Sequence, residues 1–470
     1  MSDRRSTSPL VRDGAWSLLA IALTGTVRAG ARFGAGTISV DALRTVTIAL
    51  SVAGIITIVT AGGWSSGIIK FLSELRGSDR SDDGDRLATL ASWVVVGLSV
   101  LGAGAALWYS VAAAEFDGAT AALTAVLTVV FGLYIAGKSI AYGRQQVKRQ
   151  ALLEIVGFGL FAVSLLAILR GSLAQWVIVP LVVGFLPVAS LAISRLAQLP
   201  TWRGLPTRAF AGYGLVGVVG SLAGVGFTSV TPLAADRLDA AIGAALIGAT
   251  LTYLEPLTLT PRAISLVLLP ELSRGIGRGD DRTEAAKAVR AATAISALIA
   301  GPLVAVLIVE RDRALQWLFP DDLVGGATLA WFAAAFWVSV IGAPAIAALA
   351  AIRLREASVA MWSSLVGFSV AIVLWIALGE RMGVAAIGLG YFVGSCIQVT
   401  APLIIATRFY AIAWRSLWLR LAMAAAGVFA IAATGSGLVR DLASVVLVVA
   451  VMAPELRMAA SLIRRRRTTG

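Results

Sequence analysis

Residues 71–90 read FLSELRGSDRSDDGDRLATL, and residues 268–289 read LLPELSRGIGRGDDRTEAAKAV. In both stretches a Glu-Leu pair follows an apolar run, and Arg, Gly and Asp come before a new apolar segment. Glu74 and Glu271, which start the two pairs, lie 197 positions apart. Because order and spacing agree as well as composition, we interpret the two stretches as copies of one duplicated unit.

The composition places this repeat in a membrane protein. Of the 470 residues, 58% are hydrophobic and 14% are charged, and the mean hydropathy is +0.88. Soluble domains carry about 25% charged residues. The 48 glycines are also typical of membrane helices, whose backbones approach one another closely. Since the chain has one cysteine and no histidine, it has no disulfide framework, no cysteine metal site and no histidine general base.

A membrane-spanning helix needs about 20 apolar residues. Applied along the chain, that length predicts an all-α polytopic protein with fourteen spans: 14–33, 45–68, 88–109, 120–140, 151–169, 174–194, 211–233, 241–272, 289–308, 325–352, 357–378, 384–407, 416–434 and 442–460. Span eight, 241–272, contains Pro256, Pro261 and Pro270, so it is either a kinked helix or a broken one.

The net charge of +13 is explained by topology. Most of the 39 Lys and Arg fall in the segments that share one side of the membrane, including the start of the chain and the RRRR tail at 464–467. The positive-inside rule therefore predicts that both termini are cytoplasmic. The same bias makes nucleic acid a poor partner. We expect the chain to lie in the cytoplasmic membrane of a bacterium.

The repeat also predicts how the spans are grouped. Six spans separate the two copies, and an even number gives both copies the same orientation, as in transporters with parallel repeats. We predict a first six-helix lobe over 1–203, a second over 204–408, and two further helices with a basic cytoplasmic tail over 409–470.

Several motifs occur in the order typical of one transporter superfamily. They are ARFGAGTISVDAL at 31–43, GGWSSGIIKFLSE at 62–74, LLPELSRG at 268–275, LFPDDLVGGATLAWFAAAFWV at 318–338 and GVAAIGLGYFVGS at 383–395. In these five motifs the chain resembles the multidrug/oligosaccharidyl-lipid/polysaccharide (MOP) exporter superfamily, and within it the prokaryotic polysaccharide flippases. The last motif departs from the family pattern, because its small residues are shuffled.

This resemblance implies two V-shaped lobes around a central cavity and a mechanism of alternating access. It implies a transporter that moves a lipid-linked (polyprenyl diphosphate) oligosaccharide to the outer leaflet, with membrane lipid around it. An H⁺ or Na⁺ gradient is the implied energy source. A polysaccharide polymerase and glycosyltransferases are the implied functional neighbours.

Arg28 and Arg32 are the first candidate substrate-binding residues. They lie four positions apart in the first span, so both guanidinium groups share one helix face. Arginine presents a planar fork of donors that suits phosphate oxygens, and charged residues within spans usually face a cavity or the bundle interior. The alternative is that these side chains snorkel to the outer headgroups.

Glu255 and Arg262 form a second candidate pair in span eight. They are seven residues apart, about two turns along one face. A carboxylate at this depth is costly unless it is paired, protonated or hydrated. In a functional site Arg262 would hold phosphate and Glu255 would serve as its counter-ion or as the coupling site. In a structural role the pair would fix helix packing.

Other charged residues lie near the predicted cytoplasmic ends. The repeated turn carries Glu74, Arg76, Glu271 and Arg274, which are either an inner gate between the lobes or solvated helix ends. Lys70, Lys138 and Glu154 are predicted to snorkel or to cap helices.

Two other functions stay open at this point. One is another transporter of the superfamily, either a lipid II flippase or a cation-coupled multidrug exporter. The other is a membrane polysaccharide polymerase or ligase, which the short loops and the absence of histidine disfavour. We therefore expect no enzyme activity, no cofactor and no metal site.

Overall fold

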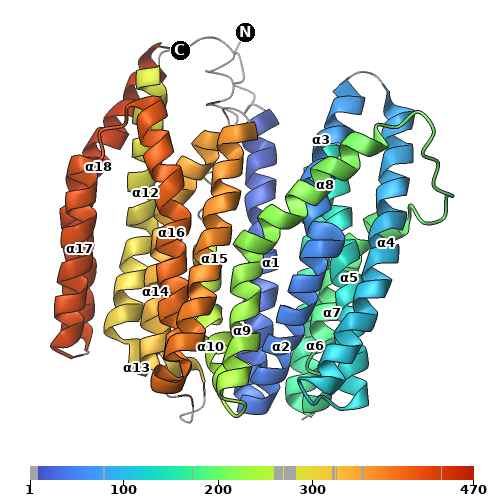
Figure 1. Cartoon of the computed structure of the whole chain (residues 1–470), viewed down its shortest axis with the longest axis horizontal. Coiled ribbons are helices and arrows are strands. Elements are labelled where there is room, and N and C mark those ends of the chain that lie inside the picture. Colours follow the sequence, from blue (N-terminus) through green and yellow to red (C-terminus); the bar gives the residue numbers. More distant parts are fainter. Residues whose placement is uncertain are drawn as a thin grey trace, which may run out of the picture. The chain divides into compact units, whose positions relative to one another are not determined.

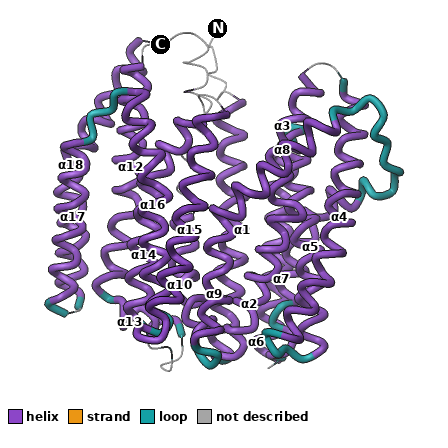
Figure 2. The backbone as a smooth tube through the Cα atoms, in the orientation of Figure 1, coloured by secondary structure: helices purple, strands orange, loops and turns teal. Residues whose placement is uncertain are grey.

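The computed structural model describes residues 9–77, 80–171, 173–258, 268, 272, 282–319, 323, 325–350, 354–435 and 437–469. Within these residues every regular element is a helix (Figure 2). The α-helices (Figure 1) are α1 (Pro9–Ile38), α2 (Val40–Thr57), α3 (Gly63–Gly77), α4 (Ser81–Ala112), α5 (Gly118–Gly143), α6 (Val147–Gly171), α7 (Val179–Ile193), α8 (Thr207–Ser221), α9 (Phe227–Leu238), α10 (Gly243–Leu254), α12 (Arg282–Val309), α13 (Arg311–Leu318), α14 (Gly326–Ala350), α15 (Leu354–Met382), α16 (Ala385–Tyr410), α17 (Arg415–Ala433) and α18 (Leu438–Thr469).

Eleven helical stretches in the described part of the chain are long and apolar enough to cross a membrane. They coincide with predicted spans two to seven and nine to thirteen. The other three predicted spans correspond to α1, to α10 with the residues after it, and to α18, which are not among the eleven. A multi-pass, all-helical membrane protein is thus confirmed, whereas the number fourteen stays a prediction.

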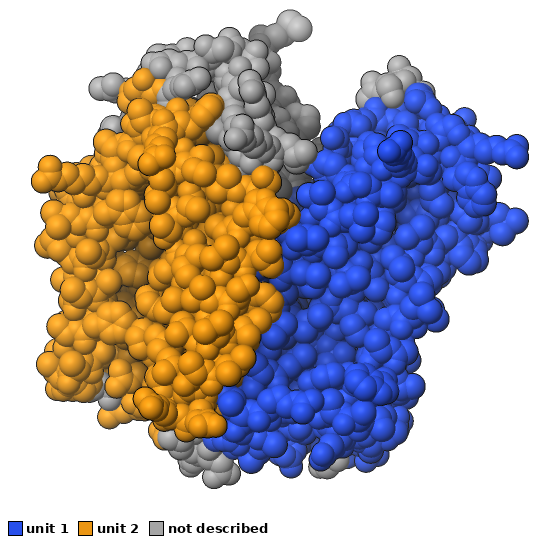
Figure 3. All heavy atoms as spheres, viewed as in Figure 1, with its two compact units in different colours: residues 1–252 blue, residues 253–470 orange. Residues whose placement is uncertain are grey.

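Two compact units divide the chain between Thr252 and Tyr253 (Figure 3). The first unit includes α8 and α9, which the sequence analysis assigned to the second lobe, because α8 packs on α3 and α9 packs on α2. The predicted lobes at 1–203 and 204–408, and the parallel relation between them, stay predictions.

Short polar residues begin two helices of the first unit. The Asp117 carboxylate accepts hydrogen bonds from the backbone N–H groups of Ala119 and Thr120, at 2.9 and 3.1 Å. The Ser39 hydroxyl accepts one from Ala42 at 3.0 Å. These bonds satisfy donors that have no partner within the helix. The Thr120 hydroxyl also donates to the Asp117 carboxylate, at 2.6 Å. This bond, followed by the backbone bonds, lowers the pKa of Asp117, because hydrogen bonds to a carboxylate stabilise its charged form.

Glycines let the central helices of the first unit approach closely. A Cβ atom on Gly137 of α5 would collide with the carbonyl oxygen of Val188 in α7, and one on Gly157 of α6 would collide with that of Gly184. Around these crossings α5 buries Leu127, Leu133 and Tyr134. Small residues at such contacts are the usual basis of helix packing in membranes, where the hydrophobic effect does not drive helices together.

The Gly157→Leu substitution is therefore expected to destabilise the first unit by about 2 kcal/mol or more, since α6 and α7 must separate to admit the side chain. Thermal unfolding of the purified protein in detergent measures the loss. Gly159→Leu on the same helix is the matched control, because a Cβ atom there meets nothing within 4 Å. Equal unfolding temperatures for the two variants would contradict the described α6–α7 contact.

The second unit has its core around α14 and α16. The rings of Phe332 and Tyr391 stack at 4.8 Å between these helices, and α15 packs on α16 where Gly367 meets the carbonyl of Gly394. Farther along the unit, Arg290 of α12 pairs with the buried Glu455 of α18 at 2.8 Å. The ion pair fastens α18 to α12 within a largely apolar bundle.

The α-helix of predicted span eight ends before its first proline. The α10 helix stops at Leu254, and a 3₁₀ turn follows over Glu255–Thr258. Proline at 256 lacks an N–H group and disfavours α-helical geometry in the residue before it. The regular α-helical geometry thus ends before Pro256, and the choice between a kink and a break stays open, because residues 259–267 lie outside the described part of the chain.

Two π-helical turns interrupt longer helices of the first unit. Ile58–Gly62 joins α2 to α3, and Leu222–Gly226 joins α8 to α9. The two turns contact each other, with 3.6 Å between the Ile58 side chain and a Cβ atom built on Gly226. Such turns are rare and often occur at functional sites.

Candidate functional site

A polar stripe runs along α1 in the first unit. Thr24, Arg28 and Arg32 recur every four residues, so they lie one above another on the same side of the helix. Arg32 is buried, with 2% of its surface exposed, and Thr24 is also buried. Gly30 and Gly34 lie on the opposite side of α1 and pack against Phe161 and Leu165 of α6. The two predicted arginines therefore share a side of α1 that lies opposite its glycine contacts with α6.

The burial of Arg32 argues against the alternative that its side chain snorkels to the outer headgroups. A snorkelling arginine keeps its charged head in water or among headgroups, and that does not fit a side chain covered to this degree. Arg28 is half-buried. That these residues bind substrate phosphate stays a prediction.

A buried carboxylate lies at the Thr24 end of this stripe. Glu154 of α6 accepts hydrogen bonds from the Tyr134 hydroxyl at 2.7 Å, the Gln150 amide at 2.9 Å and the Thr24 hydroxyl at 3.3 Å. The Lys138 ammonium group is 3.8 Å from the same carboxylate oxygen. Three helices, α1, α5 and α6, thus contribute to one polar cluster inside an apolar bundle.

The interpretation of Glu154 as a snorkelling or capping residue is wrong. Only 4% of the residue is exposed, because side chains from α1 and α5 enclose it. The sequence did contain a signal, since Gln150 and Glu154 on α6, and Tyr134 and Lys138 on α5, are both polar pairs at four-residue spacing. Polar pairs on neighbouring apolar spans indicate a shared buried contact.

Replacing Glu154 by alanine is expected to destabilise the protein by about 3 kcal/mol, because the largely covered Lys138 would lose its carboxylate partner and the Tyr134, Gln150 and Thr24 donors would lose their shared acceptor. Glu154→Gln keeps an acceptor oxygen and should lose less. The measurement is thermal unfolding in detergent, with the exposed Glu380→Ala on α15 as the control. A Glu154→Ala protein as stable as the Glu380→Ala protein would refute the buried cluster.

Glu255 is the first residue of the 3₁₀ turn that follows α10 within predicted span eight, and it is 6% exposed. Irregular backbone at membrane depth is tolerated where it is buried in protein or lines a wet cavity, so its position fits both interpretations made from the sequence. Its predicted partner Arg262 lies outside the described residues, so the pairing of the two stays a prediction.

The predicted cytoplasmic gate is described only in its first copy. Glu74 is exposed and lies 3.8 Å from Lys70 one turn earlier on α3. Arg76 donates to the backbone carbonyl of Arg144, which ties the end of α3 to the end of α5. Glu271 and Arg274 lie outside the described residues. The gate role of all four residues stays a prediction.

A second ion pair in the first unit joins the N-terminal part of α2 to the C-terminal part of α9. Arg44 of α2 binds Asp236 of α9 through two hydrogen bonds, at 2.6 and 3.0 Å. It also donates to the carbonyl of Ala114 at 3.4 Å. Asp236 is 7% exposed, so the pair is well shielded from water. The sequence analysis named neither residue as functional, because nothing local links positions so far apart.

Long apolar helices, glycine crossings and buried ionic clusters together define a polytopic membrane protein. No family model and no curated protein matches the sequence. The fold does match solved structures. An inward-facing multidrug resistance MATE family transporter of the MOP superfamily has a TM-score of 0.61 at 14% identity, over 84% of this chain and 98% of that one.

Two further structures agree. The lipid II flippase MurJ, in an inward closed conformation, has a TM-score of 0.61 at 12% identity and covers 98% of both chains. A MOP superfamily transporter from Pyrococcus furiosus has a TM-score of 0.58 at 14% identity, over 86% of this chain and 95% of that one. The chain has the fold of these MOP superfamily transporters, which is the fold that the ordered motifs predicted.

Proposed function

We propose that this chain is a flippase, a transporter without enzyme activity that carries a polyprenyl diphosphate-linked oligosaccharide to the outer leaflet by alternating access. The observation that carries the proposal is the extent of the structural match. The lipid II flippase aligns with 98% of the chain, whereas the MATE transporters align with 84–87% of it. A flippase for a lipid-linked headgroup thus accounts for the whole chain, including α17 and α18.

The arginines of α1 support an anionic substrate. A diphosphate entering a membrane protein needs cations with fixed donors, and arginine supplies them in a planar fork. Arg28 and Arg32 are the residues that we propose to hold it, with Arg262 as a third from span eight. An organic cation, the cargo of an exporter, would instead be repelled by this face of α1.

Coupling to a proton or sodium gradient is part of the proposal. Glu255 is its proposed site, because this buried carboxylate begins a turn where the α-helix has ended. Membrane carboxylates in such places commonly take part in ion relays. The enzymes that build and polymerise the oligosaccharide are the proposed functional neighbours.

Purified protein in proteoliposomes tests the function. A fluorescent polyprenyl diphosphate oligosaccharide in the outer leaflet is bleached by an impermeant reductant, and flipping exposes the rest of the pool. Protein-dependent exposure supports the proposal. Flipping of fluorescent lipid II alone would favour the lipid II flippase, and transport of an organic cation without lipid flipping would favour the exporter.

The proposed topology places both termini and the connections 70–87, 141–150 and 273–290 in the cytoplasm of a bacterium. We expect cysteines added at 141–150, in a Cys396→Ser background, to resist an impermeant maleimide in intact cells and to react after lysis. A cysteine at 111–119 should react in intact cells. Labelling of 141–150 from outside would overturn the orientation.

A further inference from the structure

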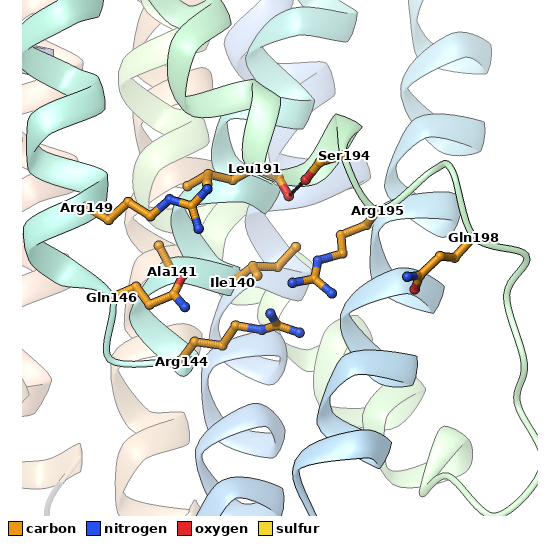
Figure 4. A pocket seen from close by; sticks show the side chains of 9 residues that line it. All are labelled: Ile140, Ala141, Arg144, Gln146, Arg149, Leu191, Ser194, Arg195 and Gln198. Carbon is orange, nitrogen blue, oxygen red and sulfur yellow. Dashed lines mark hydrogen bonds between the residues drawn. The ribbon is translucent and has the colours of Figure 1, made fainter.

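A basic pocket of about 240 Å³ opens at one end of the first unit, where α5, α6 and α7 meet (Figure 4). Arg144 follows α5, Arg149 lies in the first turn of α6 and Arg195 follows α7. Figure 4 shows their side chains reaching into the same space from these three segments. Gln146 and Gln198 also line the pocket.

Positive charge exceeds negative charge in this pocket. Asp85 of α4 is the acid that meets these arginines: it pairs with Arg144 and lies 3.4 Å from Arg195. One carboxylate therefore serves two guanidinium groups, while Arg149 and Arg76 add further charge. Burial, followed by repulsion from Arg195, Arg149 and Arg76, lowers the pKa of Arg144 to about 10. An anion in the pocket would relieve this repulsion.

The start of α6 adds to the positive potential. Its first turn contains no acidic residue, and Lys148 and Arg149 lie where the helix dipole is already positive. Acidic residues are the usual occupants of such a turn. At this helix start, an anion from outside α6 would therefore be stabilised.

Contacts from α4 hold the wall of the pocket in place. Thr89 donates to the Gln198 side chain at 3.3 Å, and the Trp93 indole donates to the Gln198 carbonyl at 2.8 Å. Arg86 donates to Thr201 at 2.9 Å. The segment after α7 is thus fastened to α4, so the pocket is built before any ligand arrives.

An apolar surface of α6 continues directly from the pocket. Leu152, Val156, Leu160 and Val163 follow Arg149 at helical spacing on one face, and each is 44–69% exposed. This face is the one that acyl chains cover in a bilayer. Basic pockets between membrane helices that adjoin such a face are suited to anionic lipid headgroups.

We propose that this pocket binds the headgroup phosphate of an anionic membrane phospholipid, whose acyl chains lie along the exposed face of α6. The lipid phosphate joins Asp85 as a second anion for Arg144 and Arg195, and Arg149 closes over it from the lipid side. The bound lipid fastens the ends of α5, α6 and α7 together. This site is distinct from the proposed substrate residues on α1.

Native mass spectrometry of the full-length protein in detergent tests the site with phosphatidylglycerol as the probe. The Arg144→Gln, Arg195→Gln double variant should bind the lipid roughly tenfold or more weakly, since each basic residue contributes about fivefold. The Arg203→Gln, Arg208→Gln double variant removes the same charge from exposed residues outside the pocket and should bind normally. Equal binding by both double variants would overturn the proposal.

Further probes separate the sources of phosphate. Zwitterionic phosphatidylcholine should bind weakly, and millimolar inorganic phosphate should not displace phosphatidylglycerol. Displacement by inorganic phosphate, or binding of a polyprenyl diphosphate in place of phosphatidylglycerol, would each overturn it. If the double variant does not fold, the exposed Arg149→Gln variant replaces it and should still bind the lipid severalfold more weakly. The readout is lipid binding, so it is independent of transport.

Discussion

Replacing Arg28 and Arg32 together by alanine is expected to lower the initial rate of flipping by about a hundredfold or more. Each arginine supplies charge-assisted hydrogen bonds worth about 1.5–3 kcal/mol, and both lie on one face of α1. Arg→Lys at both positions keeps the charge and loses the fork, so it should reduce the rate by an intermediate factor. The rate is measured with the fluorescent lipid-linked oligosaccharide in proteoliposomes.

The control for this experiment is the Arg170→Ala, Arg381→Ala protein, in which two exposed arginines are removed. It should flip lipid at the wild-type rate. The reconstituted amounts of all variants must match, since Arg32 is buried and its loss also affects packing. Wild-type flipping by the Arg28→Ala, Arg32→Ala protein would remove both residues from the mechanism.

Cross-linking positions 44 and 236 is expected to abolish transport. Arg44 belongs to the predicted first lobe and Asp236 to the predicted second, although both lie in the first compact unit. If the predicted lobes are the parts that move, alternating access has to break the ion pair between these residues. Arg44→Cys and Asp236→Cys in a Cys396→Ser background, joined by a short cleavable bis-thiol reagent, hold this contact shut. Reduction of the reagent should restore flipping.

A cross-link that stays within one predicted lobe is the matched control. Arg86 and Thr201 also meet across a hydrogen bond, at 2.9 Å, yet both lie within 1–203. Cysteines at these two positions should accept the same reagent without loss of transport. Full flipping with positions 44 and 236 joined would show that α2 and α9 do not separate during the cycle.

Local sequence features predicted the spans well. The eleven confirmed stretches are long apolar runs, and a helix of about 20 apolar residues follows from the width of the bilayer and the need to satisfy each backbone polar group. The shared helix face of Arg28 and Arg32 was also predictable, because it follows from their four-residue spacing alone. The superfamily fold followed from the order of several weak motifs, at an identity to solved structures of only 12–15%.

Contacts between distant parts of the chain were not predictable in the same way. Glu154 appears in the sequence as a charge near a helix end, and it is buried because α1, 130 positions away, and α5 pack around it. The Arg44–Asp236 pair joins residues 192 positions apart. The end of α10 at Leu254 was also not fixed by local sequence, since the three prolines of span eight allow regular helix to stop at more than one position.

Each π-helical turn changes the direction in which the side chains after it point, relative to those before it on the same membrane crossing. Each π turn adds one residue to a regular α-helix, which rotates everything after it by roughly 100°. A helical wheel drawn through α2 and α3 as one segment therefore mixes two surfaces. Both α2 and α3, on the same crossing, contact α5, but α2 also contacts α9 whereas α3 also contacts α8. The two halves of one crossing thereby present differently oriented surfaces to the neighbouring helices.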